Sequence, residues 1–166
     1  MSPWDTSWES ICNNPLLQDL PYKIETNHFN KIIMSPASSW HGGFEAEIAA
    51  ALKSRLPAGR VINECAVETS DGIKVVDVSW ISRPRYAPYH RAFSLPIAPE
   101  ICVEIVSTSN TRVEMLGKMQ LYFERGALEV WLCDENGHFE FFSCQQPEPI
   151  TSSIVCPDFP LTINWD

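Results

Sequence analysis

The sequence lacks the features of membrane-spanning, exported and multidomain proteins. It has no run of about 18 apolar residues, the length that a membrane-spanning helix needs. Its first residues have neither the basic start nor the apolar core of a signal peptide. No internal repeat, low-complexity tract or long Pro/Gly linker interrupts the 166 residues. We therefore expect a single domain spanning 1–166 and a cytoplasmic location.

Metal-binding cysteine motifs are also missing. The six cysteines form no CxxC pair, and no histidine lies at zinc-finger spacing from two of them. Cys102 and Cys133 stand within apolar runs, where a free cysteine behaves as a small hydrophobic residue. In a reducing cytoplasm we expect the thiols to stay free rather than bridged. A Cys/His metalloprotein is therefore supported by residue counts alone.

Positive charge is scarce, because 12 Lys and Arg face 21 Asp and Glu, for a formal charge of −9. This balance argues against a protein that binds nucleic acid through bulk electrostatics. The distribution of charge is uneven, however. Segment 83–125 contains six basic and four acidic residues, whereas 126–166 contains seven acidic residues and no lysine or arginine. The positive charge is therefore concentrated around the motifs described below.

Hydrophobic residues make up 45% of the chain and charged residues 20%, which is an ordinary globular composition. Apolar spacing, caps and turn residues predict helices at about 4–14, 40–56 and 110–125, the last capped within 107–109. They predict strands at about 22–26, 31–35, 61–69, 73–81, 100–106, 128–133 and 138–143, with an edge strand within 150–165. Together these elements indicate an α/β (α+β) fold, in which a mixed sheet is flanked by helices.

The strongest turn signal is Asp71-Gly72, between the strands at 61–69 and 73–81. Asp-Gly suits a two-residue type I′ turn, and this register pairs Ala66 with Asp77. It also places Asp77 on the same face as Glu64, which lies diagonal to it.

Two carboxylates occupy strands that are otherwise apolar. Glu104 lies within the run 99–106, and Asp77 lies within 75–80. A carboxylate inside an apolar strand costs several kcal/mol unless a cation or hydrogen-bond donors compensate it. Two carboxylates that converge on one sheet surface are the hard oxygen ligands that Mg²⁺ prefers. The alternatives are a solvated hairpin face for Asp77 and an ion pair with an arginine for Glu104.

Several short motifs occur in an order that resembles a known family. They are Ile33-Met34-Ser35-Pro36 followed by His41, Val76-Asp77-Val78, Pro99-x-x-x-x-Glu104-Ile105-Val106-Ser107-x-Ser109, Lys118-x-x-x-Tyr122, Gly126-x-x-Glu129-Val130-Trp131-x-x-Asp134 and Pro157-x-Phe159. This set resembles the bacterial family of "putative restriction endonucleases" within the PD-(D/E)xK nuclease superfamily. The motifs span most of the chain from Tyr22 onward.

By this resemblance the chain would be a metal-dependent endonuclease that hydrolyses DNA phosphodiester bonds. Asp77 and Glu104 would hold one or two Mg²⁺ or Mn²⁺ ions, with the main-chain carbonyl of Ile105 as a further ligand. The metal would polarise the scissile phosphate and lower the pKa of an attacking water. Lys118 would orient that water and stabilise the charge that develops on the phosphate.

The sequence departs from the superfamily pattern at two positions. Val106 stands where the superfamily lysine is expected, and Val76 stands where the superfamily has proline. The family has a lysine on the following helix instead, which matches Lys118. Glu104 lies about three residues, or about 10 Å, below the end of its strand. Lys118 lies about eight residues, or about 12 Å, into the returning helix, so the two side chains are expected at similar height.

Glu45 and Glu47, on the helix that follows His41, offer additional carboxylates, as in relatives of this superfamily. A solvated helix face is the alternative for at least one of them. His41 itself is expected to start the helix or to pack against it, with a phosphate contact as the alternative.

Arg83, Arg85 and Arg91 lie in a loop predicted over 82–96, directly after the strand of Asp77. Because lysine and arginine make most contacts with DNA phosphates, we expect these three arginines to contact the substrate. A homodimer would suit symmetrical cutting of both strands.

A non-catalytic nucleic-acid-binding or assembly module, which retains the PD-(D/E)xK fold, is the alternative function. The formal charge of −9 and the valine at position 106 both favour it. Occupancy of a metal position between Asp77 and Glu104 would discriminate between the two functions.

Overall fold

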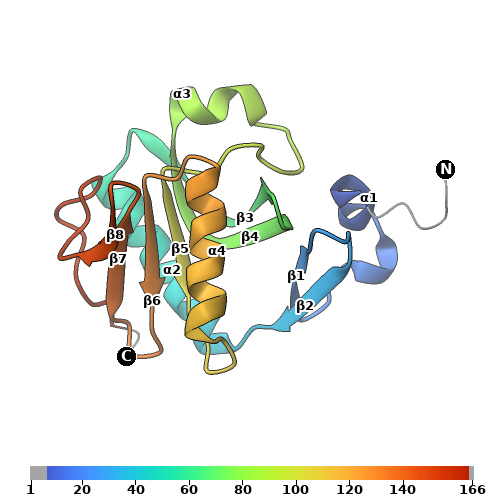
Figure 1. Cartoon of the computed structure of the whole chain (residues 1–166), viewed down its shortest axis with the longest axis horizontal. Coiled ribbons are helices and arrows are strands. Elements are labelled where there is room, and N and C mark those ends of the chain that lie inside the picture. Colours follow the sequence, from blue (N-terminus) through green and yellow to red (C-terminus); the bar gives the residue numbers. More distant parts are fainter. Residues whose placement is uncertain (1–6, 165–166) are drawn as a thin grey trace.

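Figure 1 shows the computed structural model, which describes residues 7–164 of the chain. Its helices are α1 (Trp8–Cys12), α2 (Ser39–Arg55), α3 (Arg83–Tyr86) and α4 (Arg112–Glu124), with 3-10 helices η1 (Pro15–Leu17) and η2 (Ala87–Tyr89). Its strands are β1 (Tyr22–Thr26), β2 (Ile32–Pro36), β3 (Gly59–Thr69), β4 (Gly72–Ser82), β5 (Ile101–Ile105), β6 (Glu129–Cys133), β7 (Phe139–Ser143) and β8 (Gln146–Ile150). Among the described residues, no helix is long and apolar enough to cross a membrane.

Strands β3 to β8 form a mixed sheet in the order β3-β4-β5-β6-β7-β8. β5 and β6 are parallel, and the other neighbouring strands of this sheet are antiparallel. Helix α4 makes the crossover that a parallel pair requires, and it lies against one face of the sheet (Figure 1). Helix α2 covers the other face. A mixed sheet flanked by helices confirms the fold class predicted from the sequence.

Each face of the sheet has its own apolar cluster. Phe44 and Ile48 of α2 belong to the cluster that contains Trp131 of β6. Met115 and Tyr122 of α4 belong to the cluster on the opposite face. Because both faces are covered, every residue of β5 and β6 is buried, which explains the nearly continuous apolar runs that predicted these strands.

The caps of the two long helices differ in part from those expected. α2 begins after Ser38, whose hydroxyl accepts the N–H of His41. α4 begins after Thr111, and its predicted caps at 107–109 are wrong. The Thr111 hydroxyl accepts the N–H of Glu114, and the Glu114 carboxylate accepts the N–H of Thr111. This capping box is favoured because it satisfies two N–H groups of the helix start at once.

The β3–β4 hairpin forms, but its predicted register is wrong by two residues. Thr69 pairs with Gly72, and Ala66 pairs with Val75 rather than with Asp77. The turn residues are therefore 70–71, and the Thr69 hydroxyl closes the turn by donating to the Gly72 carbonyl at 2.7 Å. A shift of two residues keeps each side chain on its predicted face, so Glu64 comes opposite Asp77 instead of diagonal to it.

Two peripheral predictions are also wrong. Segment 82–96 was expected as a loop, but it contains α3 and η2, each with a proline in its first turn, where the missing N–H is not needed. The edge strand β8 precedes the predicted 150–165 range, where Thr162 makes an isolated bridge to His138. β8 contains Pro147 and Pro149, which are tolerated because β8 is an edge strand of the sheet.

The predicted strand pair near the N-terminus is confirmed as β1 and β2, which form a separate two-stranded sheet. Three hydrogen bonds from residues 73–75 attach β1 to the start of β4. The Lys74 ammonium donates to the Thr26 carbonyl at 3.0 Å, and the Ile73 N–H donates to the Thr26 hydroxyl at 2.9 Å. The Val75 N–H donates to the Glu25 carboxylate at 2.6 Å. The β1–β2 hairpin is thereby fixed beside the turn end of the β3–β4 hairpin.

We predict that Gly72→Ala destabilises the protein. Gly72 has a φ of +81°, and an added Cβ would lie 2.6 Å from the Thr26 carbonyl oxygen, so the β1 hairpin would have to shift. The free energy of unfolding in urea should fall by more than about 1 kcal/mol. Gly117→Ala is the matched control. Its Cβ would meet nothing within 4 Å in the interior of α4, so it should stabilise by about 0.5–1 kcal/mol. A neutral Gly72→Ala would contradict this attachment of the hairpin.

Candidate active site

Asp77 and Glu104 lie on the adjacent strands β4 and β5, and they are buried, with 1% and 3% of their surfaces exposed. The ladder between these strands includes the pair Val78–Val103 but does not continue to Asp77. Instead, Oδ2 of Asp77 accepts the N–H of Ile105 at 2.8 Å. The carboxylate of Asp77 therefore takes the place of a main-chain acceptor where the two strands separate.

Two lysine side chains compensate these carboxylates. The ammonium of Lys23, from β1, lies 2.8 Å from Oδ1 of Asp77 and 3.4 Å from Oε2 of Glu104. The ammonium of Lys118, from α4, lies 3.2 Å from Glu104 and 3.0 Å from Oε2 of Glu25. The structure thus brings Asp77, Glu104 and Lys118 together, and it adds Lys23 and Glu25 to them.

The Lys118-x-x-x-Tyr122 motif holds Glu104 from one side. Residues four apart lie on the same face of a helix, so both side chains of α4 point toward β5. The Tyr122 hydroxyl donates to Oε1 of Glu104 at 2.6 Å. Burial and the nearby Glu104 carboxylate raise the pKa of Tyr122 well above its ordinary value, so the hydroxyl keeps the proton that it donates. The Lys118 ammonium contacts Glu104, which agrees with the similar height expected from the rise per residue of the strand and of the helix.

The electrostatic balance differs between the two buried carboxylates. Burial opposes the ionisation of Asp77, but Lys23 and His41 outweigh it and hold the pKa of Asp77 well below its usual range. Burial raises the pKa of Glu104, against the opposing effect of Lys118 and Lys23. Burial also opposes the charge on Lys23, but Glu104 and Asp77 raise the pKa of Lys23 well above its ordinary value. Asp77 and Lys23 therefore form an ion pair at ordinary pH.

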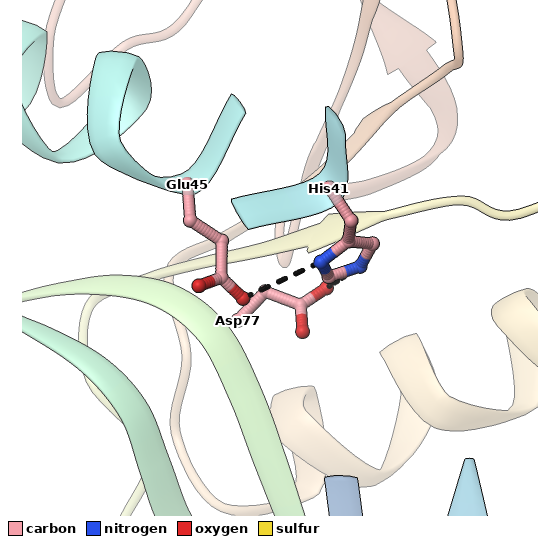
Figure 2. Close-up of side chains that lie close together, drawn as sticks. All are labelled: His41, Glu45 and Asp77. Atoms are coloured by element: carbon pink, nitrogen blue, oxygen red, sulfur yellow. Dashed lines mark ion pairs between the residues drawn. The ribbon is translucent and has the colours of Figure 1, made fainter. Parts of the chain in front are cut away.

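His41 and Glu45 approach Asp77 from the first turns of α2, as Figure 2 shows. The His41 Nε2 atom lies 3.4 Å from Oδ2 of Asp77, and its Nδ1 atom lies 3.5 Å from Oε1 of Glu45. One ligand atom from each of the three residues lies within 4.8 Å of the others, which is close enough to hold a metal ion. Of the two carboxylates offered by this helix, Glu45 faces the site and Glu47 is exposed.

Glu45 also contacts a second carboxylate, that of Glu64. Glu64 lies opposite Asp77 in β3 and has a φ of +53°, in the left-handed region, where its pairing with β4 is interrupted. Burial, the hydrogen bond with Glu64 and the charges of Glu64 and Asp77 raise the pKa of Glu45 to about 9. At neutral pH, Glu45 therefore retains its proton.

A cavity of about 910 Å³ opens onto this cluster. Its walls come from β1, β2, the first turn of α2, β3, β4, the end of β5 and α4, and they include Lys23, Glu25, Ile33, Met34, His41, Glu64, Asp77, Glu104, Ile105, Met115, Gly117, Lys118 and Leu121. The described residues that line the cavity do not include the three arginines predicted to contact the substrate, which are Arg83, Arg85 and Arg91. Arg85 instead donates to the Gly126 carbonyl at 2.7 Å, beyond the end of α4. Contact of these arginines with DNA remains an untested prediction.

The donors around Asp77 fit a hard divalent cation. Oxygens of Asp77 and Glu104 both lie within 3.4 Å of one ammonium nitrogen, so they already converge on a cationic position. The Ile105 main chain borders the same cavity. His41 and Glu45 offer a second position that shares Asp77. Carboxylate and carbonyl oxygens suit Mg²⁺ and Mn²⁺, and the imidazole suits Mn²⁺ better than Mg²⁺.

Lys23 and Glu25 were not among the site residues predicted from the sequence. The one available signal was alternation, since these residues are two apart in a predicted strand and so share a face. Nothing local, however, indicated that β1 lies against β4. That contact depends on bonds from Lys74 and Val75, which are more than 45 positions away in the chain.

We predict that Glu45→Gln changes how stability depends on pH. The ordinary pKa of this carboxyl is 4.5, and folding raises it to about 9, so the folded state retains a proton that the unfolded state loses. The stability of the wild type should therefore decline as pH rises from about 4.5 to about 9. With EDTA present, the melting temperature of Glu45→Gln should match the wild type near pH 4 and exceed it increasingly toward pH 9. The exposed Glu47→Gln is the control, and an equal response of both variants would contradict the retention of a proton by Glu45.

Comparisons with known proteins bear on the family and the fold of the chain. A family model described as "Uma2: Putative restriction endonuclease" matches residues 17–163. No curated protein is significantly similar to the chain. The fold matches a crystal structure from Anabaena variabilis, described as a putative nuclease belonging to DUF820, with a TM-score of 0.66 and 21% identity over 76% of this chain and 74% of that one. Because the family model spans nearly all of its 166 residues, this chain belongs to the Uma2 family of "putative restriction endonucleases".

Proposed function

We propose that the protein is a metal-dependent endonuclease that hydrolyses DNA phosphodiester bonds, with Mg²⁺ or Mn²⁺ as its cofactor. One observation carries the proposal: Asp77 and Glu104 converge on a single cationic position, and the Lys118 ammonium lies 3.2 Å from Glu104 beside the same cavity. Two acidic oxygens and one ammonium are the groups that metal-assisted phosphodiester hydrolysis needs.

Each residue then has a separate role. Asp77, Glu104 and the Ile105 carbonyl would hold the metal, and the Ile105 N–H, by donating to Asp77, would fix the orientation of that carboxylate. When bound, the metal polarises the scissile phosphate and supplies a water of lowered pKa. Lys118 would stabilise the negative charge that develops on the phosphate, and Glu25 would direct its ammonium toward the cavity.

The second metal position would include His41, Glu45 and Asp77. Glu64, which contacts Glu45, offers a further carboxylate, and a cation there would favour release of the proton that Glu45 retains. A cation held by His41, Glu45 and Asp77 would supply further positive charge beside the phosphate.

Contacts with the rest of the substrate are a further part of the proposal. If Arg83, Arg85 and Arg91 bind DNA, they do so away from the cavity, since Arg85 lies by the end of α4. A homodimer would place two such sites for symmetrical cutting of both strands. Neither the contacts nor the dimer is required for hydrolysis of a single strand.

A non-catalytic binding or assembly module is the second candidate. The observation that favours it is Lys23, whose ammonium already neutralises Asp77 and Glu104 without a metal. A site of this kind would be an internal ion-pair network, in which an ammonium group of the chain compensates the buried carboxylates.

We predict that Mg²⁺ and Mn²⁺ raise the melting temperature of the wild type and not that of Asp77→Asn/Glu104→Gln. A ligand that binds the folded state adds about 2.7 kcal/mol at a concentration 100 times its Kd, and neutral amides remove this binding while keeping side-chain size. Differential scanning fluorimetry with and without EDTA measures the shift. The control is Glu135→Gln/Glu148→Gln, which removes two exposed charges. A full metal-induced shift in the Asp77/Glu104 variant would mean that the metal binds elsewhere.

We predict that Lys118→Met lowers the rate of DNA cleavage by roughly 10²–10³ while the metal-induced rise in melting temperature persists. Methionine keeps an apolar stem of similar length and removes the charge. Lys53→Met, at an exposed position of α2, is the matched control and should cleave normally. Val106→Lys/Lys118→Met should recover part of the activity, because position 106 is where the superfamily has its lysine. Wild-type cleavage by Lys118→Met would exclude Lys118 from the mechanism.

A further inference from the structure

Lys23 lies where the cation of the proposed metal site would lie. Its ammonium is 2.8 Å from Oδ1 of Asp77 and 3.4 Å from Oε2 of Glu104, and these oxygens belong to the two carboxylates that would bind the metal. The side chain is 13% exposed, so water compensates little of its charge. Lys23 is therefore an internal counter-ion of the two carboxylates rather than a surface lysine.

A metal ion and this ammonium cannot occupy the same position. Mg²⁺ binds carboxylate oxygens at about 2.0–2.1 Å, and the ammonium of Lys23 already uses an oxygen of each carboxylate. Two positive charges about 4 Å apart also repel strongly at low dielectric. Occupation of the site by a divalent cation therefore requires the Lys23 ammonium to move away.

The backbone of the β1–β2 hairpin does not need to move for this exchange. Three hydrogen bonds from residues 73–75 hold Glu25 and Thr26 of β1, and none of the three involves Lys23. A lysine has four flexible methylene groups, so its ammonium can withdraw into the cavity that its own side chain lines. Glu25 lies two residues further along β1, on the same face, and lines the same cavity. Its carboxylate is available to the displaced ammonium of Lys23.

We propose that Lys23 competes with the metal for Asp77 and Glu104, and so sets the affinity of the site for divalent cations. This inference rests on the proposed metal-dependent function. Without metal, Lys23 compensates the two buried carboxylates and stabilises the folded chain. With metal, the ammonium is displaced, and part of the binding free energy of the cation is used to displace it. Removal of Lys23 should therefore have opposite effects on the stability of the metal-free protein and on its metal affinity.

The test is a calorimetric titration of Mn²⁺ into the full chain and into three variants. Lys23→Met removes the competing charge, and its Kd for Mn²⁺ should fall by roughly 5- to 150-fold, the usual range for coupled binding equilibria. Lys23→Arg keeps the charge and should bind Mn²⁺ no more tightly than the wild type. Lys31→Met removes an exposed lysine from the loop of the same hairpin, and it should leave the Kd unchanged.

The melting temperature without metal gives a second readout. It should fall in Lys23→Met and stay unchanged in Lys31→Met, because only the former leaves two buried carboxylates with less compensation. If Lys23→Met does not fold without metal, Mn²⁺ should refold it, as circular dichroism would detect. In that case the Kd for Mn²⁺ is measured with Lys23→Gln instead, because glutamine retains hydrogen-bond donors.

The outcomes separate this inference from the proposed function. Equal or weaker Mn²⁺ binding by Lys23→Met and Lys23→Gln would overturn the competition, even if the wild type cleaves DNA with Mn²⁺. Tighter binding without DNA cleavage by any of the proteins would support the competition and contradict the endonuclease. Absence of Mn²⁺ binding in the wild type and in the Lys23 variants would overturn both.

Discussion

The burial of two carboxylates on adjacent strands is the constraint on which the site depends. Asp77 and Glu104 are almost inaccessible to solvent, and neither could remain charged there without donors or cations close by. The chain supplies these from different elements. The Ile105 N–H comes from β5, the Lys118 ammonium and Tyr122 hydroxyl come from α4, and the Lys23 ammonium comes from β1.

The same constraint explains why the hairpin of β1 and β2 lies outside the main sheet. Its outer strand β2 is exposed along its whole length, so apolar burial contributes little to holding it in place. Buried polar contacts hold it instead, through Lys74 with Thr26 and through Lys23 with Asp77. Such contacts are sensitive to the charge at the centre of the site. A bound cation would therefore alter the interactions that hold the hairpin, which links cofactor binding to the wall of the cavity.

The sequence predicted those parts of the site whose signal is local. Glu104 was conspicuous because a carboxylate interrupts an apolar strand. Lys118 was identified by the resemblance to the family, and the rise of the strand and of the returning helix supported it. Lys23 could not be found in this way, because its position depends on long-range contacts between β1 and β4. The β3–β4 register was wrong because Asp71-Gly72 suits a type I′ turn, whereas Thr69 closes a turn one residue earlier. The faces of the strands were still correct, since the error was an even number of residues.

A crystal structure determined with Mn²⁺, using its anomalous scattering, tests the central claim most directly. The account predicts an anomalous peak bound by oxygens of both Asp77 and Glu104, with the Lys23 ammonium moved out from between them. A peak at His41 and Glu45 would add the second position. If the Lys23 ammonium still lies between the two carboxylates at saturating Mn²⁺, and no peak contacts either carboxylate, these residues form a structural ion-pair network and not a metal site.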